Sequence, residues 1–170
     1  MKRFLIVLLA GMIATPAMSQ DTQVTVESNG TKIINGFFTQ QQLATDSAFL
    51  WYGQNRQGFV PDQNALQNLK AKKDSIHFIV FGGTWCDDTK ALLPKFFALT
   101  DAAGLSPDRV TMIGVDRSKK TIHHLHDVFN VKNVPTIIVM KNGKEVGRVV
   151  EYGRYGMVDK ELGEIIGGSY

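Results

Sequence analysis

The chain has 170 residues, of which 44% are hydrophobic and 21% are charged, values that fit one globular domain and exclude a disordered polypeptide. Its formal net charge is +3, and two of the basic residues lie within the first three positions, so the charge balance gives no reason to expect nucleic-acid binding. Cys86 is the single cysteine, and therefore no disulfide can form within the chain.

The first nineteen residues have the pattern of a secretory signal peptide. Lys2 and Arg3 precede an apolar run from Phe4 to Ala14, and a proline and small residues follow up to Ser19. The run is shorter than the roughly 20 residues needed to cross a bilayer, which disfavours a membrane helix. We therefore expect cleavage after Ser19 and export to the periplasm or the extracellular space, with no membrane attachment after cleavage.

Residues 20–60 are expected to form an extension that packs on the main domain. Alternation from Gln23 to Ile34 around Asn29-Gly30 predicts a short hairpin. Residues 39–54 then have a helical composition and predict one helix capped by Thr39. Leu43, Ser47, Leu50 and Trp51 lie at helical spacing in it. Aromatic residues of this region are expected in the core, with a peptide-binding role as the alternative. They are Phe37, Phe38, Phe49, Trp51, Tyr52 and Phe59.

Residues 61–170 are expected to form the main domain, in which strands and helices alternate. A helix opens at Pro61-Asp62, residues 76–81 form an apolar run typical of a strand buried on both faces, and a helix follows the cysteine. A strand at 109–116, a helix at 121–129, a hairpin around Asn142-Gly143 and a last helix at 158–166 complete the order. This order predicts an α/β fold, a mixed β-sheet flanked by helices on both faces.

Three motifs surround and follow the cysteine. The segment "WCDDTK" contains it, Pro94 lies eight residues after it, and "VKNVPTIIVMKNGKEVGRVV" comes later in the chain. With these motifs the sequence resembles the thioredoxin family over residues from about 62 to 168, which implies a thioredoxin-like sheet. The Trp-Cys-Asp-Asp-Thr site and the extension are also similar to a secreted bacterial branch whose site reads Trp-Cys-Gly-Asp-Ser. The matching positions are Trp85, Cys86, Lys90, Pro94, Val134, Pro135, Thr136 and the Lys141-Asn142-Gly143 turn.

The resemblance implies that Cys86 is the nucleophile of thiol–disulfide exchange. A cysteine at the first turn of a helix has its thiolate favoured by free backbone N–H groups and by the helix dipole. In the family a cis peptide bond, here Val134–Pro135, lies against the cysteine and exposes backbone with which an extended substrate can pair. The resemblance also implies that Trp85 shapes this groove and that Gly153 lets the substrate backbone approach closely.

Two departures from the family pattern bear on mechanism. The second cysteine of the family, which releases the mixed disulfide, corresponds to Thr89, and its buried acid corresponds to Val80. The resolving thiol and its base are thus missing together, and we expect Thr89 to donate a hydrogen bond to the Cys86 sulfur. A carboxylate about 6 Å from the sulfur opposes a thiolate by roughly 0.7 kcal/mol in water. Asp87 and Asp88 are therefore expected to tune the charge of the site, with helix capping as the alternative role for Asp88.

Other candidate sites are weaker. His123, His124 and His126 resemble metal ligands, but a site needs three or four converging ligands, and a solvated or partly buried face is expected instead. His77 is expected to be a hydrogen-bonded histidine of a buried strand, and the basic stretch 117–120 is expected to be a solvated loop. We therefore predict no metal and no cofactor.

Three functions remain open. The favoured one is a monothiol disulfide oxidoreductase, in which Cys86 forms a mixed disulfide that a small thiol or a client cysteine resolves, giving reduction or isomerisation. The second is a client-binding or chaperone module without turnover, and the third is a metal-handling protein that uses Cys86, Asp88 and a histidine. The expected partners are cysteine-containing client proteins or small thiols, and not nucleic acid.

Overall fold

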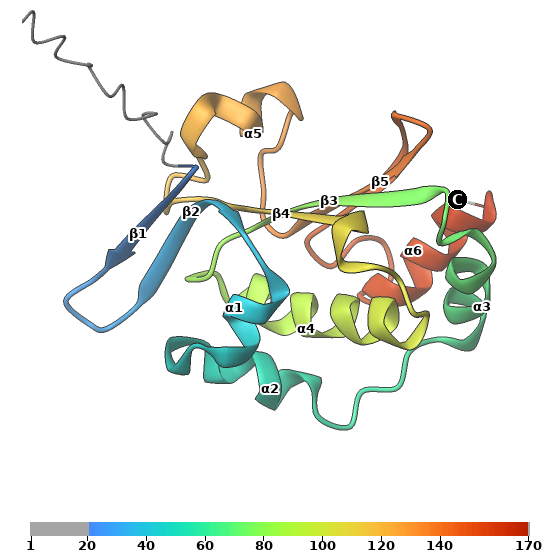
Figure 1. Ribbon diagram of the computed structural model, residues 1–170, viewed down its shortest axis with the longest axis horizontal. Coiled ribbons are helices and arrows are strands. Elements are labelled where there is room, and N and C mark those ends of the chain that lie inside the picture. Colours follow the sequence, from blue (N-terminus) through green and yellow to red (C-terminus); the bar gives the residue numbers. More distant parts are fainter. Residues whose placement is uncertain (1–20, 170) are drawn as a thin grey trace, which may run out of the picture.

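The computed structural model describes residues 21–169 (Figure 1). The predicted signal peptide and its cleavage site after Ser19 lie outside these described residues. Within the described part, no helix combines the length and the hydropathy that a membrane-spanning segment needs.

A six-stranded mixed sheet forms the centre of the molecule, in the order β1-β2-β4-β3-β5-β6 (Figure 1). β3 (Ile76–Gly82) runs parallel to β4 (Val110–Gly114) and antiparallel to β5 (Thr136–Lys141). β6 (Lys144–Val150) pairs with β5 through the predicted Asn142-Gly143 turn, where both residues have the positive φ that a tight hairpin requires. The predicted mixed sheet is thus confirmed, and its apolar strand lies at the centre.

The predicted N-terminal hairpin is an edge of the same sheet. β1 (Thr22–Val26) and β2 (Lys32–Phe38) are antiparallel, and the last residues of β2 pair with β4. Gly36 in β2 has a φ of 103°, and a Cβ atom there would collide with the carbonyl oxygen of Asp21. The extension therefore continues the sheet of the main domain.

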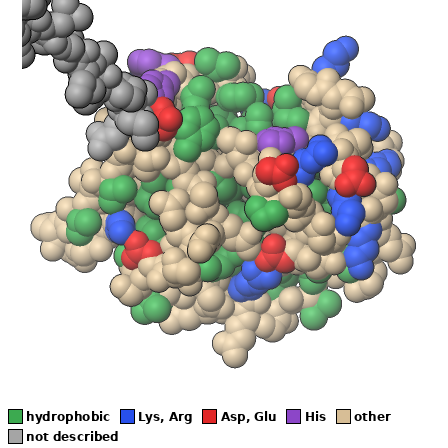
Figure 2. All heavy atoms as spheres, in the orientation of Figure 1, with side chains coloured by type: hydrophobic (Ala, Val, Ile, Leu, Met, Phe, Trp, Pro, Cys, Tyr) green, Lys and Arg blue, Asp and Glu red, His purple; other side chains and the backbone are tan. Residues whose placement is uncertain are grey.

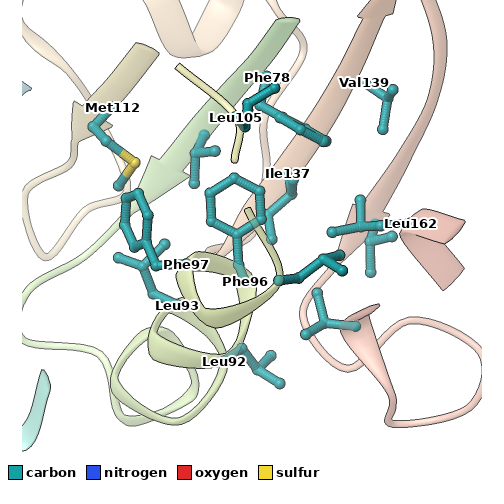
Figure 3. Close-up of a cluster of buried hydrophobic side chains, with 14 of the residues drawn as sticks. Phe78, Leu92, Leu93, Phe96, Phe97, Leu105, Met112, Ile137, Val139 and Leu162 are labelled. Atoms are coloured by element: carbon teal, nitrogen blue, oxygen red, sulfur yellow. The ribbon is translucent and has the colours of Figure 1, made fainter. Parts of the chain in front are cut away.

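Helices cover both faces of the sheet, as the element order predicts (Figure 1). α3 (Gln63–Lys72), α4 (Asp87–Ala102), α6 (Val158–Gly167) and the helices of the extension lie on one face, and α5 (Leu125–Val128) lies on the other. The larger core lies under α4. Its aromatic and aliphatic side chains pack between the helix and the strands (Figure 3). Among them are Phe78, Leu92, Leu93, Phe96 and Phe97.

The segment 39–54 forms two helices, and the single predicted helix is wrong. α1 (Gln40–Thr45) begins with a capping box at Thr39, as predicted. Asp46 then ends α1 and caps a 3₁₀ turn, after which α2 (Leu50–Arg56) follows in a new direction. The break changes which side chains are buried, because the helical spacing restarts after it.

The predicted core positions of the extension are therefore only partly right. Phe38, Leu43, Phe49 and Tyr52 are buried, and Trp51 packs against the core at partial exposure. Of the six aromatic residues expected in the core, Phe37 is 40% exposed and was predicted wrongly, and Phe59 is half-buried. Of the positions at helical spacing, Ser47 is exposed and Leu50 is 67% exposed.

The predicted helix over residues 121–129 is also interrupted. A 3₁₀ turn (Ile122–His124) precedes the short α5, and His123 and His124 have φ values of 60° and 55°. This left-handed backbone ends any regular helix. His123 and His126 consequently do not lie on one face of a regular helix.

Candidate functional site

The cysteine lies where the two parallel strands end. β3 ends at Gly82, whose carbonyl oxygen accepts a hydrogen bond from the Val115 N–H at 3.1 Å. The indole N–H of Trp85 donates to the Val115 carbonyl at 3.1 Å. A Cβ atom at Gly83 would lie 2.8 Å from the indole ring, so this glycine gives Trp85 the room to pack on the backbone. The carboxyl ends of β3 and β4 thus hold the segment that carries the thiol.

Cys86 occupies the N-cap position of the 16-residue helix α4. Its carbonyl oxygen accepts the first helical hydrogen bond, from the Lys90 N–H at 3.0 Å, and its side chain makes no capping bond. The first-turn N–H groups of a helix and its dipole favour negative charge at this position. The thiol is half-buried and packs beside the smaller core cluster, so part of its surface reaches solvent.

The loop before β5 supplies the hydrogen-bond partner of the sulfur. Cys86 Sγ donates to the Val134 carbonyl oxygen at 3.4 Å. The peptide bond between Val134 and Pro135 is cis, and both residues are buried. Residues 48 positions apart in the chain are therefore brought into contact, and the cis bond lies against the cysteine as the resemblance implies.

Thr89 does not bond to the sulfur, and the predicted hydrogen bond to Cys86 is wrong for the described structure. The Thr89 side chain is 1% exposed, and its hydroxyl oxygen accepts a hydrogen bond from the Gly83 N–H at 3.2 Å. Its methyl group packs on Gly82. Thr89 therefore fixes the backbone of the loop that leads to the thiol.

Asp88 is not the helix cap, because the N-cap residue is Cys86 and both aspartates lie inside the first turn of α4. Asp87 is exposed and pairs with Lys90 at 2.8 Å. The hydrogen bond from Lys90 lowers the pKa of Asp87, so its charge is compensated locally.

Tyr152 is a site residue that sequence reasoning missed. Desolvation raises the pKa of its phenol, and the negative charge of Asp88 acts in the same direction. These interactions place the half-exposed Tyr152 ring beside the first turn of α4. Its position one residue before Gly153 was the one signal that could have identified it.

Gly153 lies in the loop between β6 and α6 with a φ of 59°. A Cβ atom there would collide with the carboxylate of Glu161, which is 0% exposed. That carboxylate accepts hydrogen bonds from the backbone N–H groups of Arg154 and Tyr155, the latter at 2.9 Å. The glycine is thus required by the loop itself, and Glu161, which sequence reasoning also missed, holds that loop.

Arg117 lies in an exposed loop, as predicted, and its side chain is 50% exposed. Its guanidinium forms a two-pronged pair with Glu27 of the N-terminal hairpin, at 2.5 Å from Nε and 2.6 Å from the second nitrogen. The central carbon of this guanidinium lies 5.3 Å from the centre of the Trp85 ring. Lys119 in that loop donates to the Asn133 side chain at 2.7 Å, one residue before Val134. The loop after β4 therefore contacts Glu27 of the hairpin, the Trp85 ring and Asn133, the residue before Val134.

Val80 takes the place of the buried acid of the family and is 0% exposed in the core. Lysine and arginine side chains gather at the end of the molecule where β3 begins (Figure 2). A cavity of about 460 Å³ lies between α1, the end of α4 and β4, and none of its lining residues belongs to the segment 82–90. The half-buried Cys86 thiol therefore lies outside this cavity.

The histidines fit a hydrogen-bonded loop better than a metal. His124, His126 and Asp127 form the one group of described residues whose potential ligand atoms lie within 4.8 Å of one another, and Cys86 and Asp88 are not part of it. The Nδ1 atom of His126 accepts a hydrogen bond from the Thr121 N–H at 3.1 Å. In the neutral ring the proton is then on Nε2, the nitrogen that faces Asp127, whereas a metal needs a lone pair there.

Comparison with known proteins agrees with this geometry. The family model described as Thioredoxin matches residues 60–160. A thioredoxin from Echinococcus granulosus is 33% identical over 89 residues, which cover 52% of this chain and 77% of that protein.

Two solved structures share the fold. A protein of unknown function from Pseudomonas aeruginosa has a TM-score of 0.54 at 15% identity, over 76% of this chain and 91% of that chain. An HIV epitope scaffold has a TM-score of 0.51 at 14% identity, over 71% of this chain and 84% of that chain. At these identities the two matches bear on the fold alone.

Proposed function

Because the chain belongs to the thioredoxin family, a family of disulfide oxidoreductases, we propose that it is a monothiol disulfide oxidoreductase acting through a mixed disulfide at Cys86. The observation that carries the proposal is the contact between the Cys86 sulfur and the Val134 carbonyl oxygen, at 3.4 Å. A half-buried thiol at a helix N-terminus, beside backbone that can pair with another polypeptide, has what the exchange reaction needs.

The reaction proceeds by two exchanges. The Cys86 thiol first loses its proton to solvent, and the thiolate attacks one sulfur of a client disulfide, so that a Cys86–client disulfide forms and the other client sulfur leaves as a thiolate. A thiolate of the client or of a small thiol then attacks the client sulfur of this mixed disulfide and releases Cys86. The first route isomerises the client, because a different pair of its cysteines is then joined. In the second route the client sulfur carries the small thiol, and a second small thiol attacks this bond, so that the client leaves fully reduced and the two small thiols end as their disulfide. Cys86 is regenerated in both cases.

The neighbouring residues have supporting roles in this proposal. Trp85, Val134 and Pro135 line the place where an extended client lies, and the loop of Gly153 and Tyr152 closes its other side. Asp87 and Asp88 tune the charge of the site, and the pairing of Lys90 with Asp87 reduces their combined negative charge. Thr89 supports the loop, since its hydroxyl bonds to Gly83.

The proposal includes export. We propose that residues 1–19 are a cleaved signal peptide, that residues 20–60 form the extension and that residues 61–170 form the thioredoxin-like domain, in a periplasmic or extracellular protein. An oxidising compartment supplies the client disulfides on which a monothiol enzyme depends. Cysteine-containing proteins and small thiols are the proposed partners.

A client-binding module without turnover is the second candidate. The observation that favours it is the joint loss of the resolving thiol and of the buried acid, at Thr89 and Val80, with both positions packed into the interior. Such a protein would keep the groove beside Pro135 and hold clients without exchanging their disulfides.

One experiment separates the two candidates. The protein is mixed with a peptide disulfide at neutral pH and analysed by intact mass, with Cys86→Ser as the control and a reduced small thiol added afterwards. The oxidoreductase proposal predicts a mixed disulfide in the wild type, its absence in Cys86→Ser and its release by the added thiol. Equal peptide binding by both proteins without any mixed disulfide would leave the binding module.

A further inference from the structure

We propose that Arg117 is a positioning residue that fixes the Trp85 indole beside Cys86, and that Glu27 of the N-terminal hairpin holds Arg117 in place. This inference deepens the proposed function and rests on it, because it assigns the hairpin a part in client exchange. It makes residues from outside the matched 60–160 region part of the site.

The indole of Trp85 is held from several directions. Its N–H bonds to Val115, and its ring packs on the backbone of Gly83. The Arg117 guanidinium lies over the ring, with its central carbon 5.3 Å from the ring centre. Arg117 thus restrains a part of the indole that the ends of β3 and β4 do not contact.

Glu27 fixes the orientation of that guanidinium. Two carboxylate oxygens accept from two guanidinium nitrogens, which restricts the plane of the group as well as its place. The hydrogen bond from Arg117 lowers the pKa of Glu27, so the pair remains ionised at neutral pH. Since the positive charge is matched by the carboxylate, the effect of Arg117 on the site is positional.

The hairpin also holds the residue before Trp85. The Thr84 hydroxyl donates to the Lys32 carbonyl at 2.7 Å and accepts from the Ile34 N–H at 3.2 Å, both in β2. Thr84 is 3% exposed, so these bonds are shielded from water. The hairpin therefore holds this segment in two ways. β2 fixes Thr84, the residue before Trp85, and Glu27 fixes the Trp85 ring through Arg117.

The ion pair between Arg117 and Glu27 is expected to contribute little to the stability of the fold. The side chains of Arg117 and Glu27 are 50% and 27% exposed, and ion pairs in such positions contribute little to folding. A substitution there should leave the fold standing. Lysine cannot reproduce the planar two-pronged contact, so Arg117→Lys keeps the charge and removes the geometry.

The test uses Trp51→Phe as background, so that Trp85 is the one remaining tryptophan. In that background, Glu27→Gln and Arg117→Lys are compared with Glu145→Gln, which breaks the equally forked Glu145–Arg148 pair on β6. Acrylamide quenching of Trp85 fluorescence, the rate of exchange with a peptide disulfide and the rate of alkylation by iodoacetamide are measured for each protein.

We expect Glu27→Gln and Arg117→Lys to increase quenching of Trp85 and to slow peptide exchange about tenfold, the size of effect that a misplaced binding group produces. Alkylation by the small reagent should change less than peptide exchange, and Glu145→Gln should change none of the three. Unchanged quenching, or unchanged peptide exchange, in both hairpin-pair variants would overturn the inference. If the Trp51→Phe protein itself exchanges with no peptide, the proposed function fails. The quenching of Trp85 fluorescence does not depend on exchange, so increased quenching in the two variants would still support a positioning role of Arg117, and unchanged quenching would overturn it.

Discussion

The Sγ atom of Cys86 donates a hydrogen bond to the carbonyl oxygen of Val134 across 3.4 Å. The helix that begins at the cysteine and the loop that ends at Pro135 thereby meet at one point of the surface. A polypeptide that pairs with the Val134 backbone would bring its own sulfur to this thiol. The predictions below test the residues that build and support this contact.

Thr89→Val should destabilise the protein by about 1–3 kcal/mol, since it leaves the Gly83 N–H without its partner in a buried place. Hydrogen exchange at the Gly83 amide should become faster in this variant and remain slow in Thr89→Ser, which keeps the hydroxyl. The alkylation rate of Cys86 should stay the same in Thr89→Ser and Thr89→Val. A large change in that rate with an unchanged unfolding free energy would restore the bond between Thr89 and the sulfur that the sequence suggested.

Thr89→Cys should convert the site into a dithiol. The two cysteines would lie three residues apart, one at the N-cap and one in the first turn of α4, and a disulfide forms where their Cβ atoms approach to about 3.5–4.5 Å. We expect a mixed disulfide with a peptide to be released without any added thiol, as followed by intact mass. The double variant Cys86→Ser with Thr89→Cys is the control, because its remaining thiol is buried. Persistence of the mixed disulfide in Thr89→Cys would speak against this geometry.

His77 should make stability fall in mild acid. Desolvation and the nearby Arg109 lower the pKa of its ring, which bonds to the Thr111 hydroxyl at 2.8 Å. The unfolded chain therefore binds a proton more readily, and stability is lost as pH falls from about 6.5 through the lower folded pKa. The drop in melting temperature between pH 7.5 and pH 5.5 should be smaller in His77→Asn than in the wild type. An equal drop in both proteins would exclude this contribution.

Phe49 and Leu50 are adjacent residues with opposite environments. Phe49 is 2% exposed and packs edge-on against Trp51 with ring centres 6.0 Å apart, whereas Leu50 is 67% exposed. Phe49→Ala should cost about 3–5 kcal/mol of unfolding free energy, and Leu50→Ala should stay within about 0.5 kcal/mol. Denaturant unfolding of both variants measures this. Comparable losses would mean that the helix continues through Asp46 after all.

Much of the fold could be predicted because its signals are local. The apolar run 76–81 identifies the central strand, and Asn142-Gly143 specifies a hairpin because both residues accept positive φ. Asp46 broke the predicted helix, since its side chain caps the following turn and competes with helix continuation. His123 and His124 interrupt another helix through left-handed backbone for which their residue type gives no strong signal.

The site could be predicted only where a motif reports it. Trp85, Cys86 and Val134 were found from the family pattern, and they do lie together. Arg117 and Glu27 are 90 positions apart, and only the pairing of β2 with β4 brings their loops to the same place. The burial of Glu161 and the place of Tyr152 likewise follow from tertiary packing, which the spacing of residues along the chain does not encode.

The central claim is that Cys86 exchanges disulfides with a polypeptide lying beside Val134. The most direct test is the second-order rate constant for exchange of Cys86 with an extended peptide disulfide, measured against that with oxidised glutathione at the same pH. We predict that the peptide reacts at least about tenfold faster, equivalent to roughly 1.4 kcal/mol of additional binding in the groove. Equal rates for the two disulfides, or no reaction with either, would contradict the claim.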